Sequence, residues 1–126
     1  MRVLLDTHIF LWHTADPRRL TKEARRLIEG AEAVFVSAAS LWEIALKVTI
    51  GKLKADPDDL IDVLERSGFS ELHVTGRHAA RVAKLALLHT DPFDRLLVAQ
   101  AMCEPLTLLT ADVALEAYGE RVHLLR

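Results

Sequence analysis

Carboxylate residues recur in this chain at one kind of position, where an apolar run gives way to a helix-like run. They are Asp6, Glu43, Asp94 and Asp112. The runs before Asp6, Glu43 and Asp112 read as strands, whereas Asp94 opens a helix-like stretch. If those three runs are neighbouring strands of one parallel sheet, the acids emerge together at its carboxyl edge, where open α/β folds bind ligands.

A cluster of carboxylates at one edge of a sheet needs a counter-charge. Two carboxylates about 4 Å apart repel by roughly 4 kcal/mol at an effective dielectric near 20. Four together lower the stability of the fold unless a divalent cation lies among them. Because Mg²⁺ and similar hard cations prefer oxygen ligands, the pattern predicts a metal site.

Each acid also has an ordinary structural explanation. Asp6 and Asp112 have the position of helix N-caps, which accept hydrogen bonds from the first free amides. Ser40 and Glu43 have the spacing of a capping box, and Glu43 can pair with Lys47 one turn later. Capping, however, needs only one polar group, and Ser or Asn would serve. It does not explain why nearly every expected strand-to-helix junction carries an acid.

Alternation of apolar runs and amphipathic stretches predicts one α/β domain over residues 1–126, with a parallel sheet flanked by helices. The expected strands cover 3–5, 33–36, 72–74, 106–109 and 122–125. The expected helices cover 7–13, 21–29, 38–50, 56–67, 77–88, 92–103 and 112–118. Asp91 and Pro92 are expected to cap the sixth of these helices and to occupy its first position.

Composition excludes several classes of protein. A chain of 126 residues with a net charge of −2 has no bulk attraction for nucleic acid, so any such binding must be local. No uncharged apolar stretch approaches the roughly 20 residues of a membrane span. The single Cys103 excludes an internal disulfide and favours the cytoplasm. The 51% apolar content exceeds the needs of one small core and predicts a subunit interface.

Four motifs occur in order along the chain. They are Leu4-Leu5-Asp6-Thr7-His8, then Ser40-Leu41-Trp42-Glu43-Ile44-Ala45 with Lys47 and Gly51-Lys52-Leu53, then Asp91-Pro92-Phe93-Asp94-Arg95-Leu96-Leu97-Val98-Ala99-Gln100, and finally Leu109-Thr110-Ala111-Asp112. In this order they resemble the PIN-domain ribonucleases, and most closely the VapC-type toxins of toxin–antitoxin modules. The resemblance runs from the first expected strand to near the carboxyl end, so it spans nearly the whole chain. The resemblance implies a PIN-like three-layer α/β/α sandwich around a central, mainly parallel sheet.

The resemblance also implies an activity and partners. Asp6, Glu43, Asp94 and Asp112 would form the catalytic and metal-binding quartet of a Mg²⁺- or Mn²⁺-dependent endoribonuclease, with Asp6 and Asp94 as direct ligands. Expected partners are an RNA substrate, a cognate antitoxin and a second copy in a homodimer, with no membrane. Two alternatives stay open, a PIN-class nuclease of RNA processing and a non-catalytic module that binds metal or a partner.

Other polar residues have weaker claims on the site. Arg95, Thr110 and Lys47 are candidate substrate-binding residues, beside ordinary roles in ion pairs or on a solvated helix end. The six histidines lack the spacing of a zinc site. Phe10 and Trp42 are expected in the core.

Overall fold

The computed structural model describes all 126 residues, Met1 to Arg126. Its five strands form one parallel sheet in the order β3-β2-β1-β4-β5. The strands are β1 (Arg2–Leu5), β2 (Ala33–Ser37), β3 (Ser70–Leu72), β4 (Thr107–Thr110) and β5 (Val122–Leu124). The expected strand over 72–74 lies two residues earlier in the chain, and the final strand is an edge strand as predicted.

The central strand fixes the position of the acids. Val3, Leu4 and Leu5 are completely buried, as the central strand of a sheet covered on both faces requires. Leu5 lies opposite Val36 on one side and Leu109 on the other. The three strands therefore end almost level, and the residues that follow them meet at one edge.

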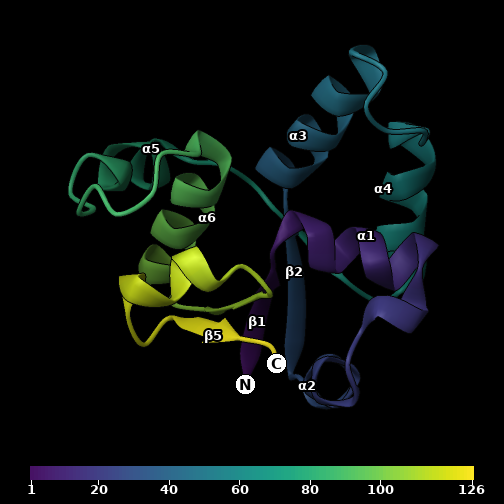
Figure 1. The fold of residues 1–126 in the computed structure, drawn as a ribbon, viewed down its shortest axis with the longest axis horizontal. Helices are drawn as coiled ribbons and strands as arrows, with labels where there is room; N and C mark the ends of the chain where they lie inside the picture. Colours follow the sequence, from purple (N-terminus) through teal and green to yellow (C-terminus); the bar gives the residue numbers. More distant parts are fainter.

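Helices cover both faces of the sheet (Figure 1). They are α1 (Thr7–Ala15), α2 (Lys22–Gly30), α3 (Ala38–Thr49), α4 (Pro57–Arg66), α5 (Gly76–Val82) and α6 (Pro92–Cys103), with short 3-10 turns η1 (Pro17–Arg19) and η2 (Val113–Tyr118). Val3 and Leu5 belong to an apolar cluster shared with α1 to α4, whereas Leu4 packs in a second cluster with α6 and η2. The three-layer α/β/α sandwich is confirmed.

The helix expected over 77–88 is wrong in its second half, because α5 ends at Val82. Beyond Val82 the backbone turns tightly, because the Leu85 amide donates to the Val82 carbonyl at 3.2 Å and the Leu88 amide to the Ala86 carbonyl at 2.9 Å. The guanidinium of Arg95 of α6 donates to the same two carbonyls, at 3.1 Å and 3.0 Å, so a tertiary contact holds this segment. The helix expected over 112–118 is a 3-10 turn. No helix combines the length and the apolar character needed to cross a bilayer.

Candidate active site

Asp6 is placed by the junction of β1 and α1. Its Oδ1 accepts a hydrogen bond from the Thr7 amide at 2.8 Å, so it caps α1 as the ordinary explanation predicts. Its own amide donates to the Leu109 carbonyl of β4 at 3.0 Å, which holds it against the neighbouring strand. The residue is only 1% exposed. A buried carboxylate so firmly held is positioned before any ligand arrives.

Thr110 connects two of the acids. Its hydroxyl donates to Asp6 Oδ2 at 2.6 Å and accepts from the Asp112 amide at 3.0 Å. Asp112 in turn caps η2, accepting from the Ala114 amide at 3.0 Å through Oδ1. The completely buried Thr110 at the end of β4 therefore orients the carboxylate of Asp6 and holds the main chain of Asp112 beside it. Thr110 lies beside the fourth acid as expected, and its role in substrate binding stays a prediction.

Glu43 points into the same edge from α3. Its Oε2 lies 3.2 Å from Lys47 Nζ, which is the pairing expected for a helix surface. Its Oε1 is buried and has no hydrogen-bond partner. The expected capping box is wrong, because Ser37 caps α3 while Ser40 accepts a hydrogen bond from the Thr7 hydroxyl at 2.9 Å. Glu43 is thus not used by the helix end, and one of its oxygens is left without a partner.

Three members of the quartet line one hollow of about 220 Å³ at the carboxyl edge of the sheet. Its lining consists of Asp6, Thr7, His8, Leu11, Glu43, Lys47, Asp91 and Asp94. A water molecule occupies about 30 Å³ of liquid, so the hollow has room for an ion with several waters. Asp112 lies outside this lining, although one of its carboxylate oxygens lies within 4.8 Å of an oxygen of Asp94.

His89 is the residue that the motif analysis missed. Its Nε2 lies 2.9 Å from Asp94 Oδ2 and 3.9 Å from Asp112 Oδ2. One ligand atom from each of these three residues falls within 4.8 Å of the others, close enough to hold a metal ion. The only signal in the sequence is a histidine two residues before the cap Asp91, and zinc spacing does not detect it.

The site raises the pKa values of its own acids. Burial, and next the carboxylate of Asp6, raises the pKa of Asp94 to about 6 against the opposing hydrogen bond from His89. Burial also raises the pKa of Asp6, although His8 and Thr110 act in the opposite direction. Asp91 and Glu43 add further repulsion at Asp94. The repulsion expected from the sequence is therefore present.

The donor set fits a hard divalent cation. Carboxylate oxygens predominate, one of them is buried without a partner at Glu43, and burial disfavours the charged form of Asp6 and Asp94. Mg²⁺ and Mn²⁺ accept such oxygen ligands and relieve such repulsion. Asp91 behaves as the expected helix cap, since its Oδ1 accepts from the amides of Phe93 and Asp94 at 2.8 and 3.1 Å.

Two other expectations concern exposure and charge pairing. Phe10 is completely buried as expected, but the expectation for Trp42 is wrong because its ring is 61% exposed. Trp42 lies edge-on to Phe93, with the ring centroids 5.3 Å apart, at the rim of the site. Arg95 donates to Tyr118 Oη at 3.0 Å in addition to the two carbonyls of the α5 region. Its guanidinium therefore has a structural task, and substrate contact by Arg95 stays a prediction.

Comparison with known proteins places this geometry in a family. Residues 3–121 match the model of the PIN domain. The chain is 31% identical over 122 residues to ribonuclease VapC22 of Mycobacterium tuberculosis, covering 92% of this chain and 91% of the relative.

Several solved structures share this fold. VapBC2 from Rickettsia felis, bound to a DNA fragment from its promoter, aligns with a TM-score of 0.73 at 19% identity over 100% of this chain and 98% of that one. A toxin–antitoxin complex from Klebsiella pneumoniae aligns at 0.68 and 18% identity over 96% and 95% of the two chains. FitAcB from Neisseria gonorrhoeae aligns at 0.63 and 21% over 98% and 96%. With its parallel sheet, its acidic edge and a family match over nearly its whole length, the chain belongs to the PIN-domain family.

Proposed function

We propose that this PIN domain is a divalent-metal-dependent endoribonuclease that acts as the toxin of a toxin–antitoxin pair. The observation that carries the proposal is the gathering of the quartet at the carboxyl edge of the sheet, with a buried orphan oxygen on Glu43 and a pKa near 6 on Asp94. The 31% identity to a VapC ribonuclease supports RNA as the substrate.

The four acids would have different roles in metal binding. Asp6 and Asp94 would hold the metal directly, while Glu43 and Asp112 would hold its waters or a second ion. When bound, the metal supplies an activated water and charge stabilisation at the scissile phosphate. Thr110 fixes the orientation of Asp6 through the 2.6 Å hydrogen bond, and His89 fixes Asp94 through the 2.9 Å contact. In-line attack by water would leave 5′-phosphate and 3′-hydroxyl ends on the two RNA fragments.

Cleavage tests the proposal directly. We expect the protein to cut RNA with Mg²⁺ or Mn²⁺ and to lose this activity with EDTA. Asp6→Asn and Asp94→Asn should abolish cleavage by a folded protein, while Asp62→Asn, an exposed acid on α4, serves as the matched control. End-labelled fragments should carry 5′-phosphates. Cleavage that persists in EDTA, or in both site variants, contradicts the mechanism.

The homodimer is proposed from one exposed apolar face. Trp42, Leu46 and Ile50 are spaced four residues apart on α3 and at its end, and they are 61%, 41% and 65% exposed. Such a stripe is typical of a helix that packs against a partner. Leu46→Glu with Ile50→Glu should convert a dimer to a monomer in light scattering, without loss of the circular dichroism spectrum. A wild-type protein that is monomeric at micromolar concentration contradicts the dimer.

An antitoxin is the second proposed partner, and the structural neighbours include toxin–antitoxin complexes. A basic side chain of the antitoxin that enters the hollow would pair with Asp6 and Asp94 in place of the cation. We therefore expect Mn²⁺ to weaken inhibition and removal of that basic side chain to relieve it. Inhibition that is indifferent to both changes contradicts neutralisation of the acids.

A further inference from the structure

A second recess lies away from the acidic edge, between α5 and the C-terminal end of α6. Three adjoining hollows of about 400, 410 and 430 Å³ each include Arg81 and Met102 in their lining. We call this recess the α5 groove and define it by six residues. They are Arg77, Arg81, Lys84, Met102, Tyr118 and Arg121.

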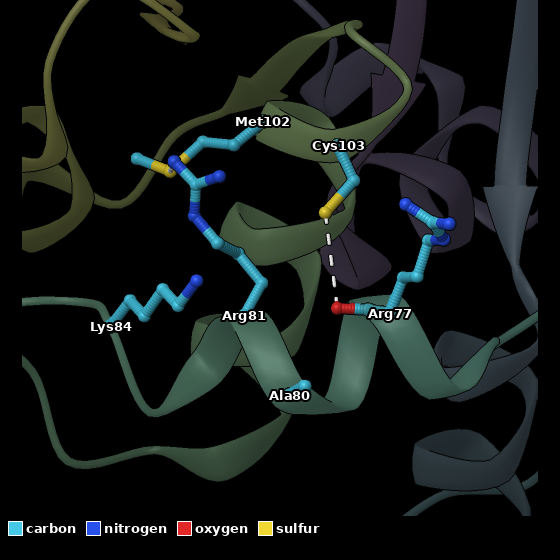
Figure 2. A pocket seen from close by; sticks show the side chains of 6 residues that line it. All are labelled: Arg77, Ala80, Arg81, Lys84, Met102 and Cys103. Carbon is cyan, nitrogen blue, oxygen red and sulfur yellow. Dashed lines mark hydrogen bonds between the residues drawn. The ribbon is translucent and has the colours of Figure 1, made fainter.

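The groove collects positive charge along α5 and the turn that follows it. Arg77, Arg81 and Lys84 follow one another at spacings of four and three residues, which places them on the same side of α5 and of the turn that ends it. In Figure 2, Arg81 and Lys84 lie on one side of Cys103 and the guanidinium of Arg77 lies on the other. No acid lines the hollow shown there, and Glu120 is the only acid in the other two.

These cations are not used by the fold. None of the four basic residues of the groove has a carboxylate oxygen within 4.0 Å. The only hydrogen bond of the Arg81 side chain is with Met102 Sδ at 3.7 Å, and a thioether is a weak acceptor. Arg95, by contrast, donates to three protein oxygens. The groove therefore presents unused guanidinium donors, which suit phosphate because their planar fork can bind two oxygens.

The groove is connected to the acidic site by two elements. Helix α6 carries Asp94 in its first turn and Met102 in its last, which is about 12 Å along the helix axis at 1.5 Å per residue. The segment after α5 lines the groove with Lys84 and Leu88, and the next residue, His89, contacts Asp94. A flexible strand bound at the acids can thus continue along this segment into the groove.

We propose that the α5 groove binds the phosphate backbone of the RNA strand beside the scissile bond. The inference rests on the proposed ribonuclease function and adds to it a binding site outside the acidic hollow. It also answers a difficulty raised by composition, since a chain of net charge −2 needs a local basic surface to hold RNA near four carboxylates. An acidic protein segment is the competing occupant.

Binding without cleavage tests the proposal. The probe is a fluorescein-labelled, 20-nucleotide single-stranded RNA of mixed sequence, titrated in EDTA between 50 and 200 mM salt and followed by anisotropy. Three phosphate contacts contribute about 2 to the slope of log affinity against log salt, at about 0.7 per contact. Over this range the affinity of the wild-type protein should fall about 20-fold more than that of Arg77→Gln/Arg81→Gln/Lys84→Gln.

A matched variant controls for net charge. Arg18→Gln/Lys22→Gln/Arg26→Gln removes the same charge from an exposed surface on η1 and α2, which Figure 1 shows far from α5. It should keep the wild-type slope. The proposal is wrong if the groove variant keeps the wild-type salt slope or if both variants lose RNA affinity equally. It is also wrong if the wild-type protein does not bind the RNA. If only the binding of poly-glutamate is lost, the groove docks an acidic protein instead.

The cleavage assay separates this inference from the proposed function. If the protein cuts RNA but the groove substitutions do not change RNA binding, the proposed nuclease function stands and the proposed role of the groove is wrong. If the groove substitutions weaken RNA binding but the protein cuts no RNA, the proposed role of the groove stands and the proposed nuclease function is wrong.

Discussion

Replacing Asp94 by Asn should stabilise the protein when metal is absent. Burial and the neighbouring Asp6 raise the pKa of Asp94 from 3.8 to about 6. Each unit of pKa corresponds to about 1.4 kcal/mol, so the ionised carboxylate costs at most about 3 kcal/mol. The side chain is 16% exposed, and solvent screening reduces the expected gain to about 1.5–3 kcal/mol. Asn keeps the size of Asp and a carbonyl that can contact His89.

The pH dependence gives the sign of the effect. Because the folded state has the higher pKa, it binds more protons than the unfolded chain between about pH 4 and pH 6. The wild-type free energy of unfolding therefore loses this contribution as the pH rises through that window. The stabilisation by Asp94→Asn should be nearly absent at pH 4 and complete above about pH 6.5.

Thermal unfolding in EDTA is the assay. For a domain of this size, about 1.5–3 kcal/mol corresponds to a Tm increase of about 5–15 °C at pH 7. Mn²⁺ should reverse the order, because it stabilises the wild-type protein by binding the folded site and has less to bind in the variant. Asp62→Asn should change neither curve. A variant that is less stable than the wild type in EDTA at pH 7 would refute the argument from repulsion.

Three smaller predictions follow from single contacts. Thr110→Val leaves Asp6 Oδ2 without its buried donor, so the free energy of unfolding should fall by about 1–3 kcal/mol and Mn²⁺ affinity should drop, while Thr110→Ser restores both. His89→Ala removes the hydrogen bond that lowers the pKa of Asp94, so the midpoint of Mn²⁺ binding against pH should move upward in calorimetry. Gly51→Ala should destabilise by about 1 kcal/mol because its φ is +76°. Gly30 is the last residue of α2, and a Cβ added there meets no atom within 4 Å, so Gly30→Ala should stabilise by a similar amount in urea unfolding.

The central strand of the sheet was predictable because burial on both faces requires an apolar residue at every position. Val3, Leu4 and Leu5 meet that demand without alternation. The junction that follows is equally constrained, since Asp6 ends the apolar run and begins a helix. The convergence of the acids followed from parallel pairing, which the register of Leu5 with Val36 and Leu109 confirms.

Features that depend on tertiary contacts were not predictable. The pattern over 77–88 is amphipathic, but α5 ends at Val82, where tight backbone turns and the guanidinium of Arg95 share the carbonyls of Val82 and Ala86. Trp42 is a residue type that is usually buried, but here it is 61% exposed and packs edge-on against Phe93. His89 joins Asp94 and Asp112 through the path of a loop, which leaves no periodic signal in the sequence.

Capping and metal binding at this edge are not alternatives, because a carboxylate has two oxygens. Asp6 gives Oδ1 to the Thr7 amide and presents Oδ2 to Thr110 and His8. Asp112 likewise gives Oδ1 to the Ala114 amide and turns Oδ2 toward His89. Ser and Asn each have only one side-chain acceptor oxygen and carry no charge, so either would cap the helix without presenting a second, charged oxygen to a cation. An aspartate at these junctions therefore caps the helix and still leaves a second carboxylate oxygen facing the site.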